Sequence, residues 1–215
     1  PVCKAKASLF DVYLVCRHDD CTELLKGPRL VRNRSSVMGK SWWSSLVPQS
    51  LNLIFSSMIN QDDPVHKRLR LLVHKAFTRR SVEQMNERIE ELTRGLLDKM
   101  EEQKEADLLQ AYALPIPVTV ISWMLGVEPA EVPAFSKIIR ILSEGMTGFS
   151  LIRSMLWDMP KAVDFLRELI ARKRRNPSDD ILTALIQAEE AGDQLTEDEI
   201  VSMTMLLIIA GHETT

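Results

Sequence analysis

The longest apolar stretch of the chain lies at its end, in residues 195–215, LTEDEIVSMTMLLIIAGHETT. Thr196 is followed three residues later by Glu199, the spacing of a capping box that satisfies backbone N–H groups at a helix start. The run over residues 200–209 is apolar nearly all round, which is typical of a buried helix. It is shorter than the roughly 20 residues that span a bilayer. The pattern therefore predicts a central helix of a protein core.

Small and polar residues, Ala210-Gly211-His212-Glu213-Thr214-Thr215, follow this apolar run. Glycine inside a helix costs about 1 kcal/mol relative to alanine, so Gly211 suggests close approach by another group. Alternatively, Gly211 ends the helix as a C-cap and the polar tail is solvated. A carboxylate after a buried run, here Glu213, is costly unless it is paired or used in chemistry. His212-Glu213 also begins the zinc-protease motif HExxH, which would need a histidine at position 216.

The first part of the chain has a different pattern. Residues 10–16 (FDVYLVC) are rich in strand formers and predict a strand. Residues 18–26 read as a short helix begun by Asp19 or Asp20 and ended by a turn at Gly27-Pro28. One early strand implies a small sheet that is completed elsewhere.

The hydrophobic positions in residues 31–61 show no regular periodicity, which predicts a long loop with short helical pieces. A loop of this length inside a compact domain is usually functional or disordered. It contains Trp42, Trp43 and Ile59, whose side chains are poorly suited to water. We favour a folded flap over an apolar cavity, and the alternative is a segment that only caps the core.

A helix is predicted to start at Asp63-Pro64, with Asp63 as N-cap and proline in the first turn. Its expected core stripe is Val65, Leu69, Leu72, Val73 and Ala76. His66 and Arg70 are four residues apart and share one face, where they can bind two carboxylates or phosphates. The alternative is a solvated basic face shared with Lys67, Arg68 and Lys75.

Helical patterns continue through the rest of the chain. The predicted helices run from a capping box at Ser81 and Gln84 to near Lys104, then over 118–125 with Gly126 as C-cap, 130–142, 160–175, and 179–190 capped by Ser178. Residues 115 and 117 are prolines, which we expect to delay the helix start to residue 118. Residues 172–175 (RKRR) fit a solvated helix end. Every regular element predicted after residue 60 is helical.

Composition narrows the possible functions. With 215 residues, of which 45% are hydrophobic, the chain can bury a sizeable core. A net charge of -3 gives no sign of a nucleic-acid or anionic-membrane partner. No signal peptide or membrane anchor is visible. Three cysteines without a CxxC pair read as reduced thiols of a cytoplasmic protein, and we expect no metal site within the chain.

Several blocks together resemble cytochrome P450 enzymes, the haem-thiolate monooxygenases. AGHETT is similar to the signature of their central helix, and DDPVHKRLRLLVHKAF to the helix after the substrate loop in the soluble bacterial type. NPSDDILTALIQAEEAGD also matches in order. The resemblance implies a mainly α fold with a small β-sheet near the N-terminus. Residues 1–215 would form a partial domain, without the start of the fold and without the C-terminal half that carries the haem-ligating cysteine.

The resemblance also implies roles for individual residues. His66 and Arg70 would hold the haem propionates, and Ala210 and Gly211 would leave room for dioxygen. Glu213 would deliver protons, Thr214 would hydrogen-bond the oxygen and hold a water, and His212 would be structural. The substrate would be contacted by the flap and the central helix, through Trp42, Trp43, Ile59, Met205 and Ile209. The connector over residues 143–159 would be a mobile lid over the substrate channel. The alternative is an ordinary surface hairpin.

The implied activity is insertion of one oxygen atom of O2 into a small organic substrate, with electrons from a ferredoxin or a flavoprotein. Cys3, Cys16 and Cys21 do not match the motif of the haem-ligating cysteine, so we expect the fragment to be inactive alone. Two other classes are a zinc-dependent hydrolase, which leaves His66 and Arg70 without a role, and a non-catalytic helical scaffold. A scaffold does not predict an acid-alcohol pair after a buried run.

Overall fold

The computed structural model describes residues 2–7, 10–27, 30–33, 49–78, 83, 85–144, 157–190 and 192–213. The chain divides into two compact units, Pro1–Lys40 and Ser41–Thr215, which are described separately. Some predicted features lie outside the described residues, namely Trp42, Trp43, Thr214, the capping box at Ser81 and Gln84, and residues 145–156 of the connector. The backbone of Glu213 is described, but its side chain is not.

The first unit contains a β-hairpin and a helix. Strands β1 (Val2–Ala7) and β2 (Phe10–Val15) pair antiparallel, and α1 (His18–Lys26) follows. Cys21 of α1 donates its thiol to the carbonyl of Val15, with 3.3 Å between sulfur and oxygen. The sequence predicted β2 and α1 but not β1, because VCKAKA contains lysines and alanines, which are weak strand formers. The small sheet is therefore formed by the preceding segment.

The second unit is mainly helical, as predicted. Its elements are α3 (Gln49–Phe55), η2 (Met58–Asn60), α4 (Val65–Ala76), α6 (Met85–Glu101), η3 (Leu109–Ala113), α7 (Pro115–Met124), η4 (Pro129–Glu131), α8 (Val132–Glu144), α10 (Met159–Arg175), α11 (Ile181–Gln187), β3 (Glu189–Glu190), β4 (Asp193–Gln194) and α12 (Glu197–Glu213). The long loop predicted over residues 31–61 thus includes α3 and η2 in its described part.

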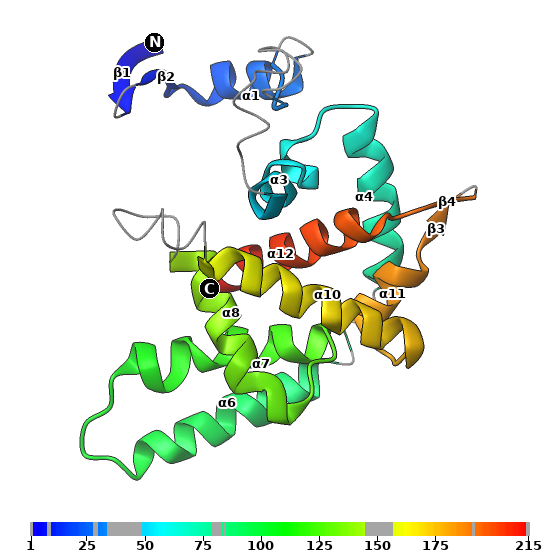
Figure 1. The fold of residues 1–215 in the computed structure, drawn as a ribbon. Helices are drawn as coiled ribbons and strands as arrows, with labels where there is room; N and C mark the ends of the chain where they lie inside the picture. Colours follow the sequence, from blue (N-terminus) through cyan, green and yellow to red (C-terminus); the bar gives the residue numbers. More distant parts are fainter. Residues whose placement is uncertain are drawn as a thin grey trace. The chain divides into compact units, whose positions relative to one another are not determined.

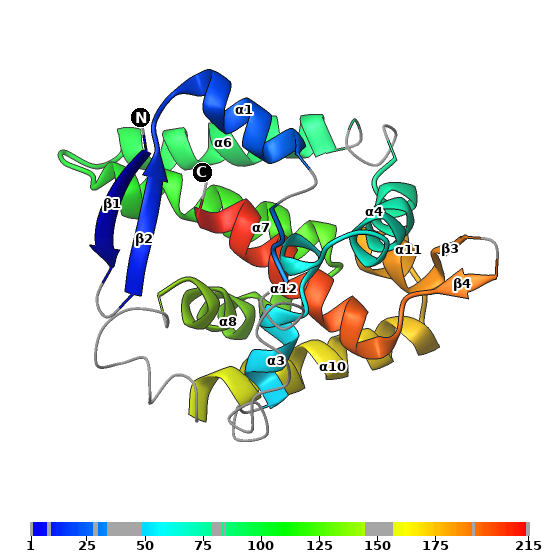
Figure 2. The same cartoon turned by 90° about the horizontal axis from the view of Figure 1, so that it is seen from above.

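Helix α12 is the centre of this unit. It contacts α3, α7, α8, α10 and α11, and in two perpendicular views it runs between them (Figures 1 and 2). Several of its side chains are almost completely buried, including Ile200, Val201, Met203, Met205 and Ile208. Its neighbours supply further fully buried residues, such as Leu72, Phe135, Leu166 and Leu182. The prediction of a central core helix is confirmed.

Two predicted helix starts were wrong. Helix α7 begins at Pro115, because a proline in the first turn lacks only an N–H that has no partner in the helix anyway. Helix α11 begins at Ile181, and its cap is Asp180, whose carboxylate accepts from the N–H of Thr183 at 2.7 Å. Gly126 does follow α7, at a positive φ of 61°.

Helix α4 also differs in detail from the prediction. It begins at Val65, and Pro64, instead of Asp63, occupies the N-cap position. Leu69, Leu72 and Ala76 are buried as expected, but Val65 is 43% exposed. The first turn therefore projects beyond the core that the rest of the helix covers.

A hairpin interrupts the helical part of the unit. Strands β3 and β4 pair antiparallel, with Glu189 opposite Gln194, and Gly192 between them has a φ of 81°. The prediction that every element after residue 60 is helical was wrong here, because two-residue strands are too short to show a period. The hairpin brings Asp193 directly before the start of α12.

The basic end of α10 is paired, and is not simply solvated as predicted. The amine of Lys173 lies 2.6 Å from Asp180 and 2.7 Å from the hydroxyl of Ser178, and the Lys173 side chain is only 10% exposed. A side chain on Gly126 would collide with both members of this pair. Arg172 forms two hydrogen bonds with Glu131. These contacts join the ends of α7, α10 and α11.

Candidate active site

The start of α12 is fixed by the predicted capping box. The N–H of Thr196 donates to Glu199 at 2.8 Å, and the N–H of Glu199 donates to the Thr196 hydroxyl at 3.3 Å. Two further acids of the first turn form ion pairs with α10, Glu197 with Arg174 and Asp198 with Arg167, each at 2.9 Å. The position of the helix is therefore set at this end by polar contacts within the chain.

The other end of α12 carries the predicted signature. The helix continues through Gly211 to Glu213, so the alternative that Gly211 ends it as a C-cap was wrong. A Cβ at Gly211 would lie 3.1 Å from the terminal methyl of Ile121 in α7, so the close approach here is between two helices. Ala210, one residue earlier, is exposed. The apolar helix thus ends with two small residues, of which Gly211 packs against α7 and Ala210 is exposed.

An apolar pocket of about 360 Å³ lies beside this part of α12. It is lined by Ile54, Ser57, Ile59, Asn60, Leu142, Ser143, Ser202, Met205, Leu206 and Ile209. Ile59, Met205 and Ile209, which the sequence singled out as substrate contacts, are therefore brought together from η2 and α12. Ile54, Leu142 and Leu206 add further apolar side chains, and the other four lining residues are three serines and Asn60. The hydroxyl of Ser57 is buried and has no hydrogen-bond partner among the described residues.

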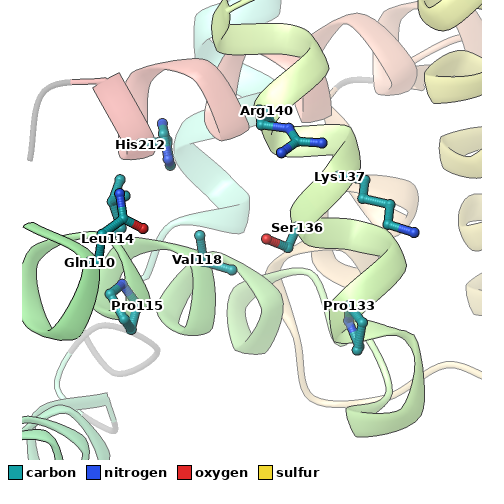
Figure 3. A pocket seen from close by; sticks show the side chains of 9 residues that line it. All are labelled: Gln110, Leu114, Pro115, Val118, Pro133, Ser136, Lys137, Arg140 and His212. Carbon is teal, nitrogen blue, oxygen red and sulfur yellow. The ribbon is translucent and has the colours of Figure 1, made fainter.

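His212 lies between this pocket and a second one. Its Nδ1 is 3.2 Å from the hydroxyl of Ser143, which itself lines the apolar pocket. On its other side, His212 borders a pocket of about 580 Å³ between α7 and α8 (Figure 3). That second pocket is more polar, with Arg140, Lys137 and Gln110 among its lining residues. His212 therefore contacts Ser143 of α8 and also borders the more polar pocket.

Helix α4 presents His66 and Arg70 on one face. The His66 side chain is 32% exposed, and its Nδ1 is 3.6 Å from a carboxylate oxygen of Asp63. Arg70 is exposed, and within the described part of the chain it has no ion pair or hydrogen bond. Arg70, one of the two residues expected to hold an anion, is therefore open to a ligand, whereas His66 lies beside Asp63.

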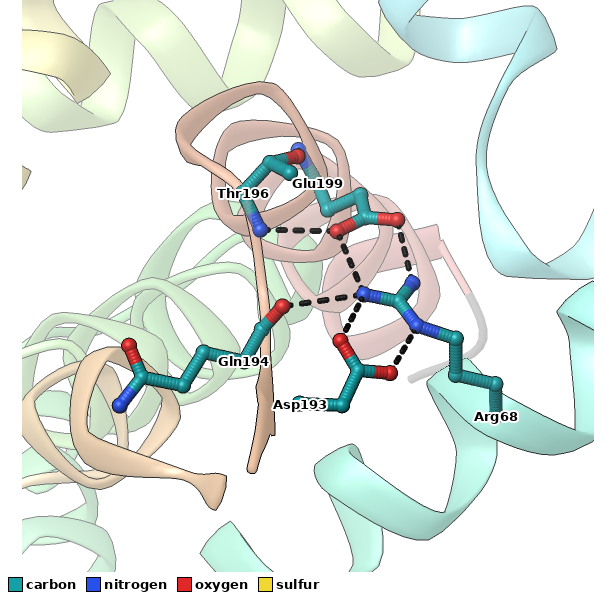
Figure 4. A network of polar contacts seen from close by, with 5 residues as sticks. All are labelled: Arg68, Asp193, Gln194, Thr196 and Glu199. Carbon is teal, nitrogen blue, oxygen red and sulfur yellow. Dashed lines mark hydrogen bonds and ion pairs between the residues drawn. The ribbon is translucent and has the colours of Figure 1, made fainter. Parts of the chain in front are cut away.

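Arg68, between these two residues, behaves differently. Its guanidinium lies between the carboxylates of Asp193 and Glu199 and also donates to the carbonyl of Gln194 (Figure 4). Hydrogen bonds to Asp193 and then to Glu199 raise the pKa of Arg68 further above its usual value. Burial raises the pKa of Glu199, but hydrogen bonds from Arg68 and Thr196 outweigh it and bring that pKa below its usual value.

The sequence analysis missed this network and grouped Arg68 with a solvated face. Its partners are 125 and 131 residues away, and no local spacing indicates such a pairing. The only available signal was the acidic composition of residues 193–199.

Two kinds of feature are absent from the described residues. No helix in them combines the length and the apolar character needed to cross a membrane. Nowhere in the same residues do three His, Cys, Asp or Glu side chains come together in a group that could hold a metal ion.

Comparisons with known proteins are consistent with the resemblance. The family model "Cytochrome P450" matches residues 54–215. A "Cytochrome P450" of Bacillus subtilis is 38% identical over 207 residues, which are 94% of this chain and 50% of that protein. The "Vitamin D(3) 25-hydroxylase" of Pseudonocardia autotrophica is 34% identical over 95% of this chain and 49% of its own length.

The fold agrees with the same family. The solved structure of the Bacillus subtilis bacillaene polyketide synthase cytochrome P450 PksS has a TM-score of 0.89 and 32% sequence identity. It covers 100% of this chain, which corresponds to 53% of that structure. The chain therefore spans about half the length of the relatives it matches. None of these matches supports a zinc-dependent hydrolase. The chain belongs to the cytochrome P450 family, whose cofactor is a haem with a thiolate ligand.

Proposed function

We propose that this chain is the substrate-binding and oxygen-facing part of a monooxygenase. The complete protein would insert one oxygen atom of O2 into a small organic substrate. The observation that carries this proposal is the apolar pocket beside the end of α12, lined by Ile59, Met205 and Ile209. It lies next to the helix segment that bears Ala210, Gly211 and Glu213.

The described residues fit a haem in two respects. His66 and Arg70 are one helical turn apart, and Arg70 has no partner in the described part of the chain, so both can bind propionates. Ala210 is exposed on a helix whose earlier residues are buried, which leaves apolar surface for a flat apolar ligand to cover. When bound, haem supplies the oxygen chemistry, and the protein supplies binding, orientation and protons.

The pocket suggests what kind of substrate binds. Its volume of about 360 Å³ suits a small organic molecule. The apolar lining would bind an apolar body and exclude water from the site. The Ser57 hydroxyl, which has no partner in the part of the chain that the structure describes, would be satisfied by a polar group of the substrate, since a buried polar group without a partner costs about 1–3 kcal/mol.

Proton delivery is assigned to the residues that follow Gly211. We expect the Glu213 carboxyl to carry protons inward from solvent, because a carboxyl group can both accept and donate a proton. The Thr214 hydroxyl would hold a water molecule and donate a hydrogen bond to the oxygen being activated. General acid catalysis of this kind contributes roughly two to four powers of ten in rate.

The remaining parts of the proposal concern the protein's surroundings. Electrons would come from a ferredoxin or a flavoprotein, as is expected for the bacterial type. A cytoplasmic location is proposed because the three cysteines are free thiols, of which Cys3 and Cys16 are exposed. The non-catalytic scaffold remains the competing hypothesis, and it predicts no haem binding.

Haem affinity of the protein and two variants of α4 tests the proposal. Arg70→Ala removes a charge-assisted hydrogen bond, so we expect haem binding to weaken by about 1.5–3 kcal/mol, or roughly 10- to 100-fold. Lys67→Ala, an exposed neighbour on α4, is the control and should change the affinity less than about twofold. Haem titration followed by absorbance gives both values. Equal effects of the two variants would mean that this face is only basic surface.

A further inference from the structure

Arg68 occupies the opposite side of α4 from the two residues assigned to haem. An α-helix turns about 100° per residue, so Arg68 is about 200° from both His66 and Arg70. Those two are separated by only about 40°. One side of the helix is therefore held by the chain itself, while the other carries His66 and the exposed Arg70.

The contacts of Arg68 join α4 to the start of α12. Its NH1 donates to Glu199 at 2.6 Å, and its NH2 donates to Asp193 at 2.9 Å and to the carbonyl of Gln194 at 3.0 Å. Its Nε also donates to Asp193. Glu199 at the same time accepts from the N–H of Thr196, so one carboxylate both caps α12 and binds α4.

These hydrogen bonds fix the distance between α4 and the start of α12 and the rotation of α4 about its own axis. A guanidinium that is hydrogen-bonded to two carboxylates is held in one orientation, because its donors lie in one plane. A lysine amine in the same place would act as a point charge without a preferred orientation. Because the fork is short and two-sided, α4 cannot rotate about its axis without breaking it. Rotation of α4 would move His66 and Arg70 relative to the segment Ala210–Glu213 at the far end of α12.

We propose that Arg68 is a positioning residue for the cofactor, which places His66 and Arg70 relative to α12 through Asp193 and Glu199. The inference rests on the proposed function, since it takes those two residues to hold haem propionates. Arg68 itself touches no ligand in this scheme. Its loss should weaken haem binding by more than its effect on folding stability explains.

The chain offers a matched control in Arg172. That residue also forms a forked contact, with Glu131 at 2.6 and 2.7 Å, and it joins α10 to η4 away from α4. The two arginine side chains are equally exposed, 32% for Arg68 and 31% for Arg172. Arg172→Ala therefore removes a comparable contact without touching the predicted haem residues.

The experiment compares haem release and thermal stability in the complete, haem-loaded protein and its variants Arg68→Ala, Arg68→Lys and Arg172→Ala. Release is followed by transfer of haem to excess apomyoglobin. Partners that orient ligand-holding residues typically contribute roughly 10- to 100-fold, so Arg68→Ala should release haem that much faster. Arg68→Lys should fall between Arg68→Ala and wild type. Arg172→Ala should lower the melting temperature similarly, but change release less than about twofold.

The outcomes separate the two proposals. Equal release rates for Arg68→Ala and Arg172→Ala, at equal loss of stability, would overturn the positioning role while leaving the proposed function intact. A wild-type protein that takes up no haem would overturn the proposed function and this inference with it. If Arg68→Ala does not fold, the comparison of Arg68→Lys with Arg172→Lys decides by the same criterion.

Discussion

The two ends of α12 differ in how their polar groups are used. At the first end, Glu197, Asp198 and Glu199 all bind arginines of the same chain. At the second end, the helix borders two pockets, and Ala210 is exposed. The first end therefore contributes to holding the fold, and we expect the second to contribute to function. If this division is correct, substitution of Glu197 or Asp198, which bind α10, should affect stability alone, and substitutions at the second end should affect activity alone.

The largest effect is expected at the second end. Glu213→Gln replaces a proton carrier by an amide, so turnover of the complete, haem-loaded protein should fall by roughly two powers of ten or more. The melting temperature should change little. The control is Glu197→Gln at the first end, which removes only an exposed pair with Arg174 and should leave turnover unchanged. Similar turnover in both variants would remove the distinction between the ends.

The second-largest effect is expected on folding stability, at the ion pair that joins the end of α10 to the start of α11. Lys173→Ala leaves Asp180 buried without its cation, and breaking a buried pair in this way costs about 3–5 kcal/mol. Urea unfolding at neutral pH measures the loss. Arg94→Ala breaks the exposed pair with Glu90 and serves as control, with an expected cost below about 0.5 kcal/mol. A loss below about 1 kcal/mol for Lys173→Ala would contradict the structural role.

Acidification should gradually reduce the folding stability that the ion pairs of Asp180 and Glu199 contribute. Burial raises the pKa of Asp180, but hydrogen bonds from Lys173, Ser178 and the Thr183 N–H outweigh it and bring it below the usual 3.8. The pKa of Glu199 is likewise below its usual 4.5. On acidification the unfolded chain therefore takes up protons first, and stability falls with pH.

The pH window follows from these directions. Stability from these groups should be complete above about pH 5.5 and decline as the pH falls through 4.5 and 3.8 and below. Urea unfolding at a series of pH values measures the decline. In Lys173→Ala the slope should be shallower, because Asp180 no longer gains from ionisation in the folded state. An equal slope in both proteins would contradict the assignment.

Local pattern predicted the fold and part of the candidate site. The capping box at Thr196 and Glu199 and the buried run of α12 followed from spacing, because both depend on residues close in sequence. The grouping of Ile59 with Met205 and Ile209 in one pocket came from the family resemblance. Periodicity alone would have assigned these three residues only to apolar positions.

The charged contacts could not be predicted in this way. Lys173 lies in a run of four basic residues that looks solvated, and its burial depends on how α7, α10 and α11 meet. Arg68 resembles its basic neighbours on α4, and only the hairpin before α12 brings Asp193 to it. On α4, contacts over more than 100 residues of sequence decide that Arg68 is paired.

The most direct test of the division within α12 is the amount of peroxide released per oxygen consumed by Thr214→Ala. Thr214 follows α12 directly in the sequence. The complete, haem-loaded protein would be supplied with electrons and an apolar substrate that the wild type converts. Electron delivery does not need the hydroxyl, so we expect Thr214→Ala to consume oxygen but to release more peroxide and form less product. The same ratio of product to oxygen in Thr214→Ala and wild type would contradict the assignment of this end to oxygen chemistry.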